Sequence, residues 1–495
     1  GRAICEIFAA DGLSTGIRRQ KWQFDHMIVR GINHFIPAWR TEKSADGVST
    51  RYGFDPQFRY NSLLAGYVNR MCRLLQGGTH VAPVAVLYHA ESEWCGAAMP
   101  FEKPVRALLR RQIDCDVVPA DVFDETESYG TSLADGVIRV NGEAFRALVI
   151  PYADRITDRV AAAVTACGAH RIPVFFVDGL PRHVVRTTYG TASQDSVLAQ
   201  GTPGGEPADP DAMTAAWLSA TQAHARVVPL EGLADALTAA DMADIHVEGV
   251  GDTTSLRCYR YRREEAELFL LFNESTLAGI EADITLPLSG TPVCLDVMEN
   301  RTRAAISRCT PQGTCVRVCL HPGETTVVLF PRDGQSVGES EKGMPYGSIL
   351  SLIDSGWRLS LADASDPDVF HPHGMLDCLC DVTAADRHPR FSGVMRYETE
   401  FWLDAVPEAA RLSLGVVHET AEVRINGSAA GIRICPPYRF DVKCLLRAGA
   451  NTLCVDVVNT LAHARQDQFS QFAAIEPSGL LGPVAIAVSL PPVGG

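Results

Sequence analysis

Hydrophobic and polar positions in the first 80 residues follow two alternating spacings. Short apolar runs at Ala3–Ala9 and Ile32–Trp39 predict buried strands, whereas apolar positions at helical spacing in Gln20–Val29 and Tyr60–Gln76 predict helices. Gly31 follows the first of these helices, where a glycine commonly ends a helix. The order strand, helix, strand, helix is typical of a parallel sheet covered by helices.

Residues 81–238 start the same order again. Strands are predicted at Val84–Tyr88, Val117–Pro119, Ala147–Pro151 and Val174–Val177, and helices at Val105–Gln112 and Arg159–Cys167. Continuous apolar runs indicate strands buried on both faces, as in an open, doubly wound α/β domain of the flavodoxin or amidotransferase type. No G-x-G-x-x-G follows the first strand, so nucleotide binding is not indicated.

Beyond residue 238 the helical spacing gives way to short strands. Their regular intervals predict a β-sandwich over 239–335. A Gly- and Ser-rich linker at 334–347 leads to a second all-β region over 348–492, which carries a long alternating strand at Phe391–Leu403 and a hairpin turn at Asn426-Gly427. The expected fold class is therefore a multidomain protein with α/β and all-β parts.

Composition and charge narrow the classes of function. With 495 residues, of which 46% are hydrophobic and 21% charged, the chain is long enough for three or four globular domains. A formal net charge of −15 disfavours binding to nucleic acid or to an anionic membrane, because phosphate attraction requires a basic surface. No apolar run predicts a transmembrane helix. Fifteen scattered cysteines without a C-x-x-C pair predict reduced thiols and a cytoplasmic protein.

Three residues of the first 80 are candidates for chemistry. In parallel βα domains, functional groups gather at the carboxyl ends of strands. Glu6 lies close to the end of the first predicted strand, where a buried carboxylate would be costly without a role or a partner; a solvated or salt-bridged glutamate is the structural alternative. His34 and Trp39 lie on the second strand and could contact a sugar or simply pack in the core.

A second group follows the first strand of the 81–238 region. The segment Tyr88–Trp94 contains His89, Glu91 and Trp94 within six positions, and it could face a neighbouring cleft or form an ordinary charged loop. No H-E-x-x-H, P-loop, EF-hand or G-x-S-x-G motif is found in the chain, so those chemistries are not indicated.

The C-terminal region carries a longer motif, V-x-I-N-G, then G, then P-Y-x-x-D, then G-x-N-x-L-x-V-x-V-x-N. Its positions are Val423, Ile425, Asn426, Gly427, Gly431, Pro437, Tyr438, Asp441, Gly449, Asn451, Leu453, Val455, Val457 and Asn459. This stretch resembles the family 2-type sugar-binding module of glycoside hydrolases. The resemblance implies a galactose-binding-like jelly-roll over 348–492 and contact with carbohydrate.

The N-terminal stretch CEIFAADGLSTGIRRQKWQFDHMIVRGINHFIPAW looks like the last part of the catalytic barrel of family 106 α-L-rhamnosidases. Glu6 matches a catalytic glutamate of that family, Lys21 and Asp25 match its K-x-x-x-D segment, and Arg30–His34 matches R-G-I-N-H. Residues 81–238 are similar to the α/β domain that follows the barrel in family 42 β-galactosidases. The resemblance spans the whole chain.

The resemblance implies a glycoside hydrolase that acts on oligosaccharides of plant or microbial origin, with α-L-rhamnosides as one candidate substrate. In the inverting pattern of family 106, Glu6 would be the general base, and His34, Trp39, His89, Glu91 and Trp94 are candidates for substrate binding. Glycosidases generally need two carboxylates, and only Glu6 can be assigned. The alternative is therefore a non-catalytic carbohydrate-binding protein or a fragment of such an enzyme.

Residues 1–80 are too few for the eight βα units of a barrel, so we expect its C-terminal part with an N-terminal portion missing. Such a part should leave an open sheet edge and exposed apolar side chains at Ile4, Ile7 and Phe35. The resemblance allows for calcium, although no ligand cluster in the sequence indicates it, and no other cofactor is expected. The sugar, the linkage and any oligomeric state stay open.

Overall fold

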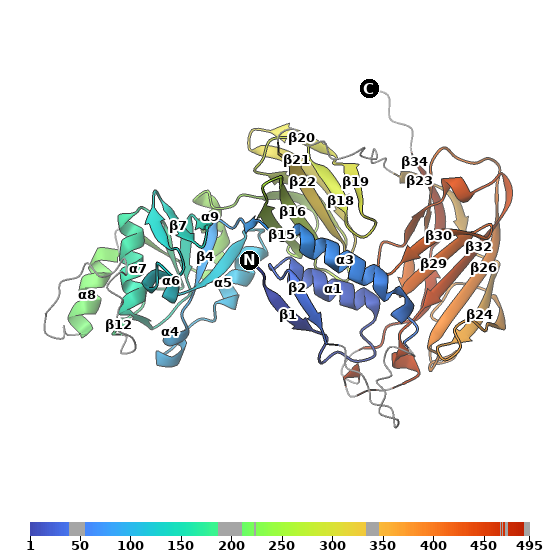
Figure 1. The fold of residues 1–495 in the computed structure, drawn as a ribbon, viewed down its shortest axis with the longest axis horizontal. Coiled ribbons are helices and arrows are strands. Elements are labelled where there is room, and N and C mark those ends of the chain that lie inside the picture. The colour runs from blue at the N-terminus through green and yellow to red at the C-terminus, as the bar shows by residue number, and fades with distance from the viewer. Residues whose placement is uncertain are drawn as a thin grey trace.

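A computed structural model describes residues 1–38, 55–186, 210–221, 224–332, 346–465, 467, 469–470 and 474–489. Trp39 and most of the predicted linker at 334–347 lie outside the described residues. The molecule is elongated: an α/β unit occupies one end, an all-β unit occupies the other, and the N-terminal elements and a β-sandwich lie between them (Figure 1). No helix in the described ranges has the length and apolar character to cross a membrane.

The N-terminal unit is a parallel pair of strands covered on one face by helices. Strands β1 (Ile4–Ile7) and β2 (His34–Pro37) flank helix α1 (Ile17–Ile28), and α3 (Asn61–Leu74) follows. In the described part of the chain, β1 and β2 pair only with each other, which leaves the expected open edge. These bounds agree with the sequence pattern to within a few residues.

The expectation of exposed apolar side chains on this unit holds in part. Ile4 is 59% exposed and Ile36 is 53% exposed, but Ile7 is only 8% exposed and Phe35 is partly buried, so the prediction was wrong for both of these residues. Side chains alternate between the two faces of a strand. Ile7 and Phe35 therefore point towards the helices, where Phe35 contacts Phe24 edge to face at 4.9 Å between ring centroids.

The α/β unit contains a five-stranded parallel sheet in the order β13-β11-β9-β4-β5. The strands are β4 (Val84–Tyr88), β5 (Cys115–Pro119), β9 (Ala147–Ile150), β11 (Val174–Val177) and β13 (Ala225–Val228). Helix α7 (Asp158–Ala169) packs on one face, and α5 (Glu102–Leu109) and α9 (Leu233–Ala239) pack on the other. The segment after β4 is a short helix, α4 (Ala90–Cys95), where the sequence analysis considered a charged loop.

The next unit is a β-sandwich with a single apolar core between its sheets. One sheet has the order β14-β17-β21-β20 and the other β19-β18-β22-β16-β15-β3. The strands are β3 (Thr79–His80), β14 (His246–Val250), β15 (Leu256–Arg262), β16 (Ala266–Asn273), β17 (Ile280–Leu286), β18 (Val293–Asp296), β19 (Arg301–Ala304), β20 (Ser307–Thr310), β21 (Gly313–Leu320) and β22 (Thr325–Pro331). Strand β3 comes from the chain before the α/β unit and adds an edge to this sandwich.

The C-terminal unit is built from two large sheets and a short pair, β28 (Val416–His418) with β33 (Gly479–Gly482), around one core. In this core Trp357, Tyr397 and Phe440 are fully buried. The sheet orders are β23-β34-β27-β31 and β25-β24-β26-β32-β29-β30. The strands are β23 (Tyr346–Ile353), β24 (Trp357–Asp363), β25 (His371–Leu376), β26 (Gly393–Leu403), β27 (Ala410–Ser413), β29 (Thr420–Ile425), β30 (Ser428–Arg433), β31 (Arg439–Asp441), β32 (Gly449–Val458) and β34 (Val484–Ser489). The turn between β29 and β30 has positive φ at Asn426 (52°) and Gly427 (80°), which confirms the predicted hairpin.

Candidate functional site

The pairing of β1 and β2 brings Glu6 and His34 to one face of the N-terminal sheet. In this parallel pair Glu6 lies opposite Ile36, and Ile4 lies opposite His34. Side chains two residues apart share a face, so Glu6, Ile4, His34 and Ile36 point to the side away from α1. The side chain of Glu6 is exposed and that of His34 is half-buried, so a molecule in solution can reach the carboxylate.

The backbone immediately after this carboxylate is strained. Phe8, two residues beyond Glu6, has φ of 72°, which is rare for a bulky side chain. Its ring is nevertheless buried and packs edge to face on Phe24, with 5.0 Å between ring centroids. Strained backbone that is held in place by surrounding packing is often found at functional sites. The packing of Phe8 thus fixes the direction in which the chain leaves β1 next to Glu6.

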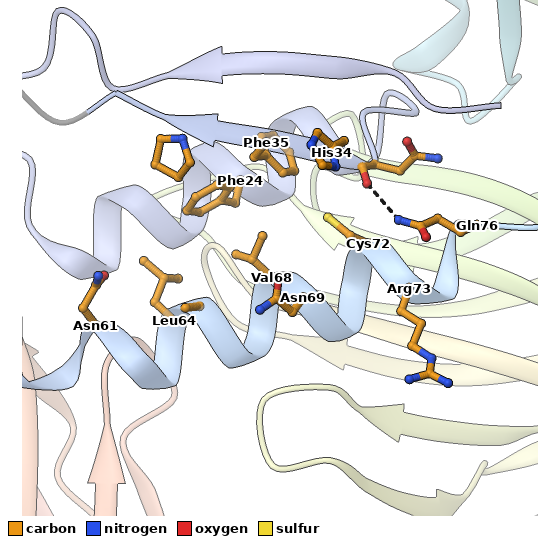
Figure 2. A pocket seen from close by; sticks show the side chains of 13 residues that line it. Phe24, His34, Phe35, Asn61, Leu64, Val68, Asn69, Cys72, Arg73 and Gln76 are labelled. Atoms are coloured by element: carbon orange, nitrogen blue, oxygen red, sulfur yellow. Dashed lines mark hydrogen bonds between the residues drawn. The ribbon is translucent and has the colours of Figure 1, made fainter.

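A cavity of about 530 Å³ lies beside β2, between it and α3. Phe35 lines it from the strand, Asn69 and Arg73 line it from the helix, and Gln76 lines it just beyond the end of that helix (Figure 2). The Gln76 side-chain amide donates to the backbone carbonyl of Asn33 at 3.4 Å. The volume is in the range of small-molecule sites, and the mixture of aromatic and amide groups suits a polar ligand with an apolar face.

A buried ion pair fixes α1 against the neighbouring β-sandwich. Lys21 Nζ lies 2.6 Å from Asp25 Oδ2, and it also donates to the carbonyl of Gly323 at 2.8 Å. Asp25 accepts hydrogen bonds from the hydroxyls of Tyr67 and Thr325, at 2.6 and 2.7 Å. Burial opposes a charged Lys21, but the Asp25 carboxylate outweighs that cost, so the pKa of Lys21 is raised. The network joins α1, α3 and the β21–β22 turn.

A second buried carboxyl, Glu419, joins the N-terminal unit to the C-terminal one. Its Oε2 accepts a hydrogen bond from Gln57 Nε2 at 3.0 Å, and Gln57 Oε1 accepts from the backbone N–H of Ile17 at 2.8 Å. Burial raises the pKa of Glu419 to about 7, although Gln57 and Arg18 act in the opposite direction. An added Cβ at Gly16 would overlap the Glu419 carboxylate, so only glycine allows this approach.

The candidates His89, Glu91 and Trp94 lie in the α/β unit, and α4 is set apart from β1 and β2 (Figure 1). They follow β4, which lies between β5 on one side and β9 on the other, so the strand order reverses at β4. Open α/β sheets bind ligands at the carboxyl end of the strands where the order reverses. Trp94 is 83% exposed and Glu91 is half-buried. His89 is 1% exposed, and burial lowers its pKa, although a hydrogen bond with the Met99 backbone acts in the opposite direction.

The structure therefore brings two of the candidates, Glu6 and His34, together on one sheet face. Sequence reasoning did not identify Phe8 or Glu419. No local pattern marks Phe8, whose strain depends on packing, and the partners of Glu419 lie about 360 to 400 residues away along the chain. Over the described ranges, no three His, Cys, Asp or Glu side chains gather as metal ligands, so calcium has no assigned site.

Comparison with solved structures finds the same fold in a rhamnosidase from Novosphingobium sp. PP1Y. The match has a TM-score of 0.64 and 19% sequence identity, and it covers 97% of this chain and 46% of that chain. This chain thus spans about half of the rhamnosidase and shares the fold of the matched part. Weaker matches include an exo-carrageenase from Bacteroides ovatus (TM-score 0.39, 11% identity, 65% of this chain and 39% of that chain) and a variant of a GH42 β-galactosidase from G. stearothermophilus (0.38, 11%, 63% and 50%).

Comparison with protein-family models and with curated protein sequences gave no match.

Proposed function

We propose that this chain is part of a glycoside hydrolase whose substrates are oligosaccharides with α-L-rhamnosyl residues. The observation that carries the proposal is the fold shared with a rhamnosidase over 97% of this chain. A second observation supports it: the exposed Glu6 near the carboxyl end of β1 is followed by a strained Phe8, which is the kind of position where parallel βα proteins place catalytic groups.

In this proposal the N-terminal strands and helices are the last part of a (β/α)8 barrel, and the C-terminal unit is a jelly-roll that binds carbohydrate. Glu6 acts as the general base of an inverting reaction. Its carboxylate takes a proton from a water molecule, the water oxygen bonds to the anomeric carbon, and the glycosidic bond breaks as an acid protonates the leaving oxygen. Glu6 is exposed, so water can reach it. The acid is not assigned to a residue.

The fixed surroundings of Glu6 contribute to this mechanism. A general base works only when it is within hydrogen-bond reach of the proton that it removes. The Lys21–Asp25 network anchors α1 on the β-sandwich, and Phe24 of α1 packs against Phe8. These contacts give the carboxylate a rigid support, and they make Lys21 and Asp25 positioning residues.

Hydrolysis of a panel of aryl glycosides by the full chain tests the proposal. We expect turnover of the α-L-rhamnoside and little or none of the β-galactoside, β-glucuronide and α-L-arabinoside. Proton NMR of the first sugar anomer released should show inverted configuration at the anomeric carbon. Turnover with retained configuration would overturn the role of Glu6 as general base, and no turnover of any glycoside would overturn the proposal for this chain.

A non-catalytic role in carbohydrate binding is the second candidate, favoured by an exposed tryptophan on the C-terminal unit. Trp402 of β26 is 66% exposed, and its ring lies against Gly449. An exposed aromatic face of this kind can stack on a sugar ring. Binding of neutral oligosaccharides that Trp402→Ala abolishes, in a chain that hydrolyses no glycoside, would favour this second candidate.

A further inference from the structure

A cleft between the β-sandwich and the C-terminal unit is lined by arginines. Two adjoining cavities of about 220 and 350 Å³ have Arg303, Arg411 and Arg439 in common, along with Glu324 and Thr326. The larger cavity is in the range of small-molecule sites. Because one wall comes from β19 and β22 and the other from β27 and β31, the cleft exists only when the two units are docked.

The strand pattern explains why guanidinium groups line the second wall. Leu412 and Phe440, which lie opposite each other in the β27–β31 pair, are fully buried in the core. Their neighbours Arg411 and Arg439 must then point outward, because side chains alternate along a strand. On the facing wall, Arg303 of β19 belongs to the cavity lining.

The cleft holds more positive charge than its carboxylates compensate. Arg411 Nε binds Asp441 Oδ1 at 2.9 Å. Arg303 and Arg439, in contrast, make no ion pair with a carboxylate in the described part of the chain. Glu324 lines both cavities, and Asp296, Glu299 and Asp441 line the smaller one. Burial raises the pKa of Glu324, whereas Lys21, Arg303 and Arg439 act in the opposite direction. Arginines therefore outnumber carboxylates in the lining of both cavities, in a chain of net charge −15.

His321 adds an unpaired polar group to the same cleft. It lines the larger cavity, and its Nε2 is buried without a hydrogen-bond partner among the described residues. Burial and the nearby Arg439 lower the pKa of His321, so the imidazole is neutral near pH 7. A buried nitrogen without a partner is costly, and a ligand hydroxyl in the cavity would remove that cost.

We propose that this cleft is an accessory site for an acidic saccharide unit, in which Arg303 and Arg439 bind the anionic group and His321 binds a hydroxyl. Guanidinium groups pair with carboxylate or sulfate oxygens through two parallel hydrogen bonds, which gives both charge and geometry. The identification of the ligand as a saccharide rests on the proposed function, whereas the anionic chemistry rests on the cleft alone. A uronic acid or a sulfated sugar would supply that chemistry.

Calorimetric titration of the full chain with trigalacturonate, a sulfated trisaccharide, a neutral trisaccharide and inorganic sulfate tests this inference. We expect binding of an acidic trisaccharide that weakens as salt is raised, and no binding of the neutral one. The double variant Arg303→Ala/Arg439→Ala should lose on the order of tenfold or more in affinity. The matched control Arg106→Ala/Arg390→Ala, which removes two exposed arginines elsewhere, should bind like the wild type.

Equal affinity of the two double variants, or equal binding of neutral and acidic trisaccharides, would overturn the inference. Binding of inorganic sulfate as tight as that of the trisaccharides would overturn the saccharide part. Thermal unfolding of each variant shows that a loss of affinity is not a loss of fold. Because binding is measured without hydrolysis, a chain that binds acidic trisaccharides but cleaves no glycoside refutes the proposed function and leaves this inference standing.

Discussion

The buried pair of Lys21 and Asp25 gives a prediction that can be worked out from its contacts. Its side chains are 5% and 0% exposed, and the two charged atoms are 2.6 Å apart. Asp25→Ala would leave the Lys21 ammonium buried with the Gly323 carbonyl at 2.8 Å and the Tyr67 ring centroid at 5.4 Å. It would also remove the acceptor of the Tyr67 and Thr325 hydroxyls. A buried charge without a counter-charge is strongly unfavourable.

The expected loss follows from these contacts. Removing one partner of a buried ion pair costs about 3–5 kcal/mol, and each hydrogen bond to a charged group contributes about 1.5–3 kcal/mol. Because neighbouring contributions do not add fully, we expect Asp25→Ala to lower the free energy of unfolding of this region by about 4 kcal/mol or more. Urea unfolding followed by tryptophan fluorescence, to which Trp22 of the same helix contributes, measures this loss.

A matched variant separates the lost attraction from the stranded charge. Lys21→Met/Asp25→Leu removes both charges and keeps apolar volume, and such replacements of a buried pair are often close to neutral. We therefore expect the double variant to be more stable than Asp25→Ala. The reasoning would be refuted if Asp25→Ala unfolded within about 1 kcal/mol of the wild type, as exposed ion pairs do, or if the double variant were as unstable as the single one.

Three further predictions concern the junctions between units. Gly16→Ala should separate α1 from Glu419 and lower the melting temperature, whereas Gly77→Ala, with open space at its Cβ, should cost only the strain of its positive φ. The pKa of Glu419 is raised to about 7, so between pH 4.5 and 7 the carboxyl group keeps its proton in the folded protein and loses it in the unfolded chain. The free energy of unfolding should therefore fall by about 3 kcal/mol over this pH range, and Glu419→Gln should remove this fall in urea titrations. Burial opposes the charged form of His80, but Asp114 and Asp116 raise the pKa of its imidazole well above the ordinary value. The contribution of His80 to the stability of the folded state should therefore be complete below about pH 6.5 and decline as the pH rises through the raised pKa. The urea midpoints of the wild type and of His80→Phe should converge at alkaline pH.

Sequence patterns predicted those elements whose signal is local. The strands at Val84–Tyr88 and Val174–Val177 have the bounds expected from their uninterrupted apolar runs. The turn at Asn426-Gly427 was equally clear, because positive φ at two successive positions favours these residue types. The short helix α4 was missed since six residues are too few to show helical spacing.

Features that depend on distant packing could not be predicted. The apolar runs of β1 and β2 predicted two strands, but which face the helices cover decides whether Ile7 is buried, and that information is not local. Glu6 and His34 could be named as candidates, yet their common face depends on the register of the two strands. The cleft around Arg303 and Arg439 joins strands more than 130 residues apart, and only the docked units reveal it.

The most direct test of the proposed activity is the kcat/KM of the full chain for an aryl α-L-rhamnoside, compared between the wild type and Glu6→Gln. The control is Glu408→Gln, which changes an exposed glutamate of the C-terminal unit. A general base contributes about 10²–10⁴-fold, so the proposal predicts a loss of that size in Glu6→Gln and none in Glu408→Gln. Equal kcat/KM for wild type and Glu6→Gln would contradict the assignment of Glu6 as the base of this reaction.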